Sequence, residues 1–221
     1  MREQKLSDTA KMHALFAGLD DTSFHTALSL FESKTVRYGK GETVRAMGMP
    51  FCSFGVVLSG NIQVFSLDTE GAPVMMASVG KGESFGESLA YLGTAESPVL
   101  VMAAADSTVL WLDADALKKK TQEADALAVA LSERLTAVLA VRALSQNDRI
   151  QILSKPRIRE RLLCYFSQCE RRYGGRTFIL PFDRASLAVY LGVNRAALSR
   201  ELAKMKGEGI IDFFRSSFRL L

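Results

Sequence analysis

Residues 183–210 carry the stretch DRASLAVYLGVNRAALSRELAKMKGEGI, which decides the fold. It predicts two short helices separated by a turn at Gly192-Val193, with Asn194 as the N-cap of the second helix. That second helix is expected to run from Arg195 to about Lys206. Apolar side chains at i, i+4 and i+7 should face a core, and these are Leu198, Leu202 and Met205. The pattern predicts a helix-turn-helix.

The opposite face of the second helix carries the candidate DNA-binding residues. In a helix-turn-helix the second helix enters the major groove and presents its N-terminal half to the base edges. Arginine suits such a face, because its guanidinium makes paired hydrogen bonds to guanine or phosphate. The candidates are Asn194, Arg195, Ala196, Ser199, Arg200 and Lys204.

Charge is divided unequally along the chain. The whole sequence has a net charge of +4, but residues 149–221 hold 15 Lys and Arg against 6 Asp and Glu. Residues 1–148 hold 13 basic and 18 acidic residues. This asymmetry indicates that the C-terminal part meets a polyanion. A hairpin around Arg215-Ser216-Ser217 is expected to form a wing beside the second helix.

Two further helices precede this region. A basic helix over residues 156–173, with Ser154 as N-cap and Gly174-Gly175 at its end, should bury Ile158, Leu162, Leu163, Tyr165 and Phe166. Residues 115–148 predict one long helix, followed by a hinge at about residues 146–154. Its apolar stripe favours a seam between two copies of the chain, the alternative being packing on its own domain. The stripe comprises Leu127, Leu131, Leu135, Val138, Val141 and Leu144, and the first five are the candidate dimerisation residues.

Upstream of the long helix the pattern changes. Residues 33–113 contain short β-branched runs punctuated by glycines, which is typical of an all-β barrel or sandwich. Residues 8–30 predict helix, broken at residues 18–21 and capped again by Asp21 or Thr22. The expected organisation is α+β, with a β-domain over 1–114, a helix and hinge over 115–150, and a DNA-binding domain over 151–221.

Composition and missing motifs exclude several classes. No apolar run is long enough for a membrane helix, and no signal core follows the first residues, so a cytoplasmic protein is expected. The three cysteines, Cys52, Cys164 and Cys169, do not make a disulfide framework. A cupin-type metal oxygenase needs histidines inside the barrel, whereas His13 and His25 precede the strands. An alternative function is a ligand-binding regulatory module that does not bind DNA. The predicted helix-turn-helix argues against this alternative.

Several short motifs occur in a fixed order. They are Leu15-Phe16-Ala17-Gly18-Leu19, Gly39-Lys40-Gly41-Glu42-Thr43-Val44, Ser59-Gly60 followed by Ile62-Gln63-Val64-Phe65, Gly80-Lys81-Gly82-Glu83-Ser84-Phe85-Gly86-Glu87, Glu160-Arg161-Leu162, and Gly192-Val193-Asn194-Arg195 with Leu198-Ser199-Arg200. In order and spacing they resemble the CRP/FNR family of bacterial transcription regulators over nearly the whole chain. The resemblance implies an N-terminal β-roll, a long dimerisation helix and a C-terminal winged helix-turn-helix. It also implies a homodimer on an inverted repeat of double-stranded DNA, a small-molecule effector, and RNA polymerase as a partner.

The effector region departs from the pattern of cyclic-nucleotide-binding members. In those members an arginine shortly after Gly-Glu holds the cyclic phosphate, and the glutamate holds the ribose. Here Glu96 stands at the arginine position, and a carboxylate repels a phosphate. The resemblance therefore implies an effector other than cAMP or cGMP, for which a small apolar or aromatic molecule is expected. The candidate pocket residues are Gly86, Glu87, Ser88, Glu96, Ser97 and Val138. For Glu87 we favour a structural role, in which its side chain caps or holds a loop, over a role in ligand binding.

The resemblance implies two possible cofactors, an iron–sulfur cluster and haem. An iron–sulfur cluster of the FNR kind needs four cysteines, and this chain has three, so that cluster is excluded. No metal-ligand set is predicted. Haem-based sensing stays an alternative, with candidate axial ligands His13, His25, Met47, Met49, Met75, Met76 and Met102.

The resemblance also extends to the recognition helix. There Ala196 stands at the position of the glutamate that, in the family, accepts a hydrogen bond from cytosine.

Overall fold

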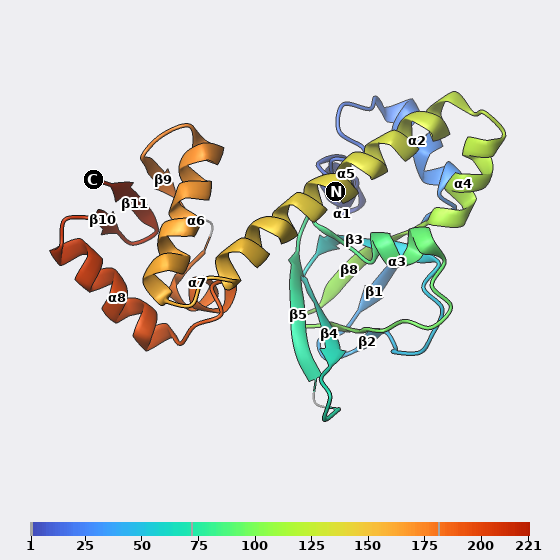
Figure 1. Ribbon diagram of the computed structural model, residues 1–221. Coiled ribbons are helices and arrows are strands. Elements are labelled where there is room, and N and C mark those ends of the chain that lie inside the picture. Colours follow the sequence, from blue (N-terminus) through green and yellow to red (C-terminus); the bar gives the residue numbers. More distant parts are fainter. Residues whose placement is uncertain (1, 72, 181) are drawn as a thin grey trace. The chain divides into compact units, whose positions relative to one another are not determined.

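The computed structural model contains two compact units, residues 1–140 and 141–221 (Figure 1). It describes residues 2–71, 73–180 and 182–221, and for residues 2–6 the backbone alone. The order of elements is α+β, as predicted, with β-sheets in the N-terminal unit and a helix-turn-helix with a small sheet in the C-terminal unit.

Two four-stranded antiparallel sheets form the N-terminal unit, in the orders β1-β8-β3-β6 and β2-β7-β4-β5. Their inward faces share one apolar core, in which Phe51, Phe54, Ile62 and Leu112 are completely buried. The runs predicted as strands lie in these sheets. The strands are β1 Lys34–Tyr38, β2 Thr43–Arg45, β3 Ser53–Ser59, β4 Asn61–Leu67, β5 Pro73–Gly80, β6 Ser84–Phe85, β7 Leu100–Ala103 and β8 Ser107–Asp113.

Gly60 is a corner between the two sheets. Strands β3 and β4 flank Gly60 and belong to different sheets, so the chain crosses from one sheet to the other at this residue. Gly60 has a φ of +86°, and a Cβ would lie 2.3 Å from Ser107 Oγ. Only glycine fits this crossing.

Four helices accompany the sheets: α1 Arg2–Lys11, α2 Asp21–Leu30, α3 Glu87–Leu92 and α4 Ala114–Gln122. The cap of α2 is Asp20 rather than the predicted Asp21 or Thr22, because its carboxylate accepts a hydrogen bond from Ser23 N at 2.7 Å. Phe16, Phe24 and Phe31 make edge-to-face contacts that attach this N-terminal segment to the core.

The predicted long helix is two helices. Helix α4 ends at Gln122, Ala124 adopts a φ of +58°, and α5 then runs as 28 residues over Ala126–Leu153. The hinge expected at residues 146–154 is therefore helical through Leu153. Leu131 and Leu135 are buried in the core of the N-terminal unit, so their assignment to a seam between protomers is wrong. Periodicity locates an apolar face but does not say what covers it.

The C-terminal unit packs α6 Ile158–Tyr173, α7 Arg184–Tyr190 and α8 Arg195–Gly207 with a sheet of order β10-β11-β9. Its strands are β9 Thr177–Ile179, β10 Ile211–Phe214 and β11 Ser217–Leu220. Gly174 ends α6 in the left-handed conformation, as predicted. Ser154 is not the N-cap of α6, because its hydroxyl donates back to Gln151 O in α5 and α6 begins later. Leu163, expected to point inward, is 40% exposed.

Candidate nucleic-acid interface and effector region

The turn between α7 and α8 is built from local capping. Asn194 Oδ1 accepts hydrogen bonds from Ala196 N at 2.8 Å and Ala197 N at 3.3 Å, which fixes the start of α8. Asp183 caps α7 in the same way, by accepting from Ser186 N at 2.7 Å. This backbone hydrogen bond lowers the pKa of the Asp183 carboxyl. The Asn194 cap was predicted from the sequence, whereas the Asp183 cap is seen only in the structure.

Arg161 holds the turn from outside. Its Nη1 donates to Leu191 O at 2.9 Å and Gly192 O at 3.0 Å, and its Nε donates to Lys155 O at 2.8 Å. Gly192 has a φ of +62°, a conformation in which glycine is unstrained. Helix α6 thereby fixes the angle at which α7 leads into α8.

The predicted recognition surface lies on the exposed face of α8. Leu198, Leu202 and Met205 are buried, as expected. The remaining face is open to solvent, and Ser199 Oγ donates within the helix to Arg195 O at 3.0 Å. The exposed candidates are Asn194, Arg195, Ala196, Ser199, Arg200 and Lys204. The set combines two arginines and a lysine with the polar Asn194 and Ser199 and the small apolar Ala196.

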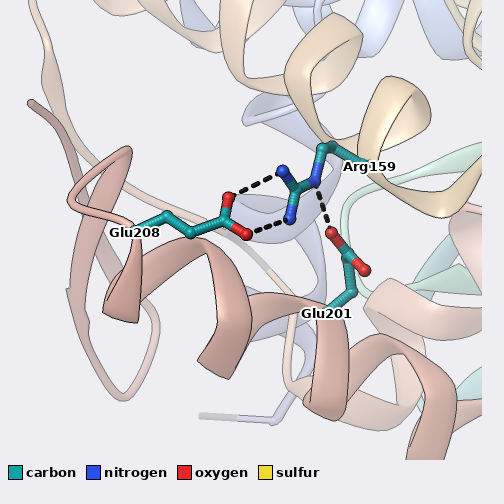
Figure 2. Close-up of polar contacts among 3 residues, drawn as sticks. All are labelled: Arg159, Glu201 and Glu208. Atoms are coloured by element: carbon teal, nitrogen blue, oxygen red, sulfur yellow. Dashed lines mark hydrogen bonds and ion pairs between the residues drawn. The ribbon is translucent and has the colours of Figure 1, made fainter.

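An arginine that sequence reasoning missed attaches α8 to α6 (Figure 2). Arg159 Nε donates to Glu201 Oε1 at 2.6 Å, while its Nη1 and Nη2 donate to the two carboxylate oxygens of Glu208 at 2.7 and 3.0 Å. These bonds raise the pKa of Arg159 and lower that of Glu208. The only signal in the sequence is that Glu201 and Glu208 are seven residues apart, on one face of the helix.

The wing closes the C-terminal unit. Its turn has Arg215 at a φ of +53°, within the predicted hairpin. Lys206, at the end of α8, pairs with Asp212 Oδ1 at 2.6 Å and donates to Phe213 O at 3.2 Å. The wing is therefore fixed to the recognition helix by side-chain bonds as well as by the core.

In the N-terminal unit, Glu87 belongs to a buried polar chain. His13 Nδ1 accepts from Leu15 N at 3.3 Å, so the proton is on Nε2, which donates to Ser84 Oγ at 2.9 Å. Ser84 Oγ in turn donates to Glu87 Oε1. Glu87 is 1% exposed. The arrangement fits the interpretation of Glu87 as a structural tie.

The other candidate effector residues differ in how deeply they are buried. Ser97 is buried, and its hydroxyl bonds to the backbone of Val99, which closes a loop. Ser88 and Glu96 are exposed, and Val138 is partly buried on α5. Gly86 is covered by an aromatic ring, since a Cβ there would lie 2.3 Å from Phe51 Cε1.

Arg45 is a second residue that sequence reasoning missed. Its guanidinium lies over Trp111, 4.9 Å from the ring centroid, and over Phe51 at 5.4 Å. Its Nε is buried without a hydrogen-bond partner. With Phe85 packed edge-to-face on Trp111 at 5.4 Å, these side chains fill the part of the roll next to Gly86.

Five of the candidate haem ligands are hydrogen-bonded within the protein or exposed. Both ring nitrogens of His13 are occupied by hydrogen bonds. His25 Nδ1 lies 2.6 Å from Asp21 O on exposed helix α2, and Met49, Met75 and Met76 are exposed. These residues do not fit an axial haem site as they stand. Within the described residues, no three His, Cys, Asp or Glu side chains are grouped to hold a metal, and no helix is long and apolar enough to cross a membrane.

Comparison with known proteins identifies both units. Residues 35–124 match the cyclic nucleotide-binding domain, and residues 156–221 match the Crp-like helix-turn-helix domain. The cyclic AMP receptor protein of Thermus thermophilus is 26% identical over 200 residues, which cover 89% of this chain and 87% of that protein. Electron transport regulator A of Shewanella oneidensis is 24% identical over 178 residues, covering 78% and 69%.

A solved structure supports the same fold. The catabolite activator protein of Thermus thermophilus superposes with a TM-score of 0.54 at 24% identity, covering 94% of this chain and 93% of that one. At this identity the likeness establishes the fold. The two domain matches, in this order on one chain, identify the kind of protein.

Proposed function

Because this chain belongs to the CRP/FNR family of transcription regulators, which are not enzymes, we propose that it is a homodimeric, effector-gated regulator of an inverted DNA repeat. Its N-terminal unit would sense a small molecule, and its C-terminal unit would bind double-stranded DNA in the cytoplasm and engage RNA polymerase. Effector binding would change the population of dimers whose two recognition helices match the half-sites.

The observation that carries the DNA-binding proposal is the exposed face of α8. Arg195, Ser199 and Arg200 stand on it, and the opposite face is fixed by Leu198 and Leu202 in the core. A rigid, basic helix at the second position of a helix-turn-helix is suited to the major groove. The N-terminal half would meet base edges, and Lys204, nearer the other end, would meet phosphate.

A second feature of α5 supports the dimer. Ala137, Val141 and Leu144 are exposed, and they follow one another at i, i+4 and i+7. Val141 and Leu144 are 63% and 66% exposed, which is unusual for apolar side chains on a long helix. We propose that this stripe, in place of Leu131 and Leu135, meets the same stripe of a second copy.

We further propose that the effector is not cAMP. Glu96 is exposed in the loop where the family's phosphate-binding arginine would stand. Phe51 covers Gly86, and Glu87, the residue expected to meet the ribose, is bonded to Ser84 within the protein. A small apolar or aromatic effector would match the aromatic side chains next to Gly86, namely Phe51, Phe85 and Trp111, although these fill that part of the roll and would have to move to admit it. The two histidines that could serve as axial haem ligands, His13 and His25, are hydrogen-bonded within the protein, which does not favour haem.

Selection of binding sites from random DNA tests the regulator. We expect the enriched sites to be inverted repeats with half-site centres about 34 Å apart. Ala196 has no hydrogen-bond acceptor and can contact a thymine methyl, so A·T should be accepted at the base pair it faces. Arg200→Ala should weaken binding by about 1–3 kcal/mol and relax specificity at one position per half-site.

The matched control is Lys204→Ala, which removes one positive charge from the same helix. This variant should lower the affinity for all DNA sequences evenly and reduce the salt dependence of binding. An obligate G·C pair opposite residue 196, or an equal loss for all sequences in Arg200→Ala, would show that the reading residues are misassigned.

A further inference from the structure

The C-terminal unit contains a cavity of about 300 Å³ away from the recognition helix. Its walls come from the last turns of α5, from α6 and from the segment around α7, and they include Arg149, Tyr165, Arg172, Phe182 and Tyr190. No residue of α8 lines it. The volume is at the lower end of the range for pockets that hold small organic ligands.

The lining of this pocket is positively charged. Arg142, Arg149 and Arg172 contribute three guanidinium groups, and the lining residues include no carboxylate. The hydroxyl and thiol groups do not compensate for this charge, because burial raises the pKa of the Tyr190 phenol and of the Cys169 thiol. At neutral pH both remain protonated, so neither adds a negative charge to the pocket lining.

Arg149 supplies an independent sign of a missing ligand. Its Nε is buried and has no hydrogen-bond partner. The guanidinium lies 5.5 Å from the ring centroid of Tyr190, which holds it in place by a cation–π contact. Buried donors are nearly always paired in folded proteins, so an orphaned one in a cavity wall indicates a place for an acceptor.

The remaining wall is aromatic. Tyr190 and Phe182 stack with ring centroids 4.9 Å apart and an interplanar angle of 30°, and Tyr165 lies 5.2 Å from Tyr190. An aromatic surface beside guanidinium groups recognises a planar ring that carries an anionic group. A bare inorganic ion would leave this surface unused.

We propose that this pocket is a second ligand site, which binds a small organic phosphate. Its phosphate would accept hydrogen bonds from Arg149 and Arg172, and its planar ring would lie against Tyr190 and Phe182. A DNA phosphate is the competing occupant. We favour the small molecule because the recognition helix does not line the cavity and because a backbone phosphate brings no ring to the aromatic wall.

Calorimetric titration of the full chain tests the site, with adenosine 5′-monophosphate as the probe and inorganic phosphate and adenosine as comparisons. Wild-type protein should bind the monophosphate at least tenfold more tightly than either comparison. Arg149→Gln and Arg172→Gln should each weaken that binding tenfold or more. Arg171→Gln is the matched control, because Arg171 neighbours Arg172 on α6 but donates to Ser167 outside the pocket. It should bind as the wild type does.

Several outcomes would overturn the proposal. They are failure of the wild type to bind the monophosphate, or binding that survives both pocket variants and therefore belongs to the N-terminal unit. A loss of DNA affinity in both variants, with no binding of the monophosphate, would assign the pocket to a DNA phosphate. Arg172 is exposed, so its variant keeps the test valid if Arg149→Gln fails to fold. Selection of DNA sites by the Arg172→Gln variant, without ligand, tests the proposed function separately. Enrichment of an inverted repeat in that experiment would show that the regulator function holds even if the pocket proposal fails.

Discussion

Arg159 joins α6 to two points on α8, through Glu201 and Glu208. Arg159→Gln removes the charge and the forked geometry, and it leaves Glu201, whose side chain is only 22% exposed, without its partner. We expect the melting temperature of the C-terminal unit to fall by a few degrees and DNA affinity to fall for all sequences alike. Calorimetry and titration of a fixed DNA site measure the two effects. Unchanged values in both would show that the core alone positions α8.

The same contact predicts a dependence on pH. Hydrogen bonds from Arg159 lower the pKa of Glu208 from its ordinary value of 4.5. A carboxyl with a lowered pKa stabilises the fold above its ordinary pKa, and this stabilisation is lost as the pH falls through the lowered value. The difference in melting temperature between wild type and Arg159→Gln should therefore be constant from about pH 6 to 8 and shrink below pH 4.5. A difference that persists in strong acid would contradict this origin.

The effector region also makes a prediction about single residues. Glu96 is exposed where a phosphate-binding arginine would be needed, and Phe51 covers Gly86. In the Arg172→Gln variant, in which the proposed pocket of the C-terminal unit is disabled, millimolar cAMP should therefore leave the melting temperature unchanged. A ligand at 100 times its dissociation constant would add about 2.7 kcal/mol to the free energy of unfolding. A clear rise with cAMP, absent with adenosine, would show that the region rearranges to accept the nucleotide.

At the scale of elements, the turn between α7 and α8 depends on one backbone conformation. Gly192 has a φ of +62°, and a Cβ there would lie 3.1 Å from Leu153 Cδ2. Gly192→Ala should lower the free energy of unfolding by about 1 kcal/mol or more, because a left-handed residue with a Cβ is strained. Gly175→Ala is the matched control, since a Cβ there meets open space. Denaturant unfolding that gives equal losses for both variants would refute the role of the turn.

At the level of the whole molecule, the proposed dimer depends on the exposed stripe on α5. Leu144→Glu would place like charges in an apolar seam, at a cost of several kcal/mol once desolvated. We expect wild-type protein to sediment as a dimer and Leu144→Glu as a monomer that no longer prefers an inverted repeat. Leu92→Glu, which adds the same charge to an exposed leucine on α3, should remain dimeric. If the Leu144→Glu variant remains dimeric, the dimer interface does not include this stripe.

The order of elements and the helix-turn-helix followed from the sequence alone. Capping by Asn194, the glycine at residue 192 and the i, i+4, i+7 spacing of Leu198, Leu202 and Met205 are local signals, and the structure agrees with each. Such local features can be predicted from the sequence because each involves residues within two helical turns of one another. The exposed face that carries Arg195 and Arg200 could be predicted for this reason.

Only the tertiary structure decided which partners cover these elements. The apolar period of α5 was visible, but Leu131 and Leu135 are buried within their own unit, whereas Val141 and Leu144 are exposed. Arg159 reaches Glu201 and Glu208 across 42 and 49 residues, and His13 reaches Ser84 across 71. Such contacts depend on how distant segments pack. Spacing along one chain specifies which face of an element is apolar or charged, but only packing specifies what that face meets.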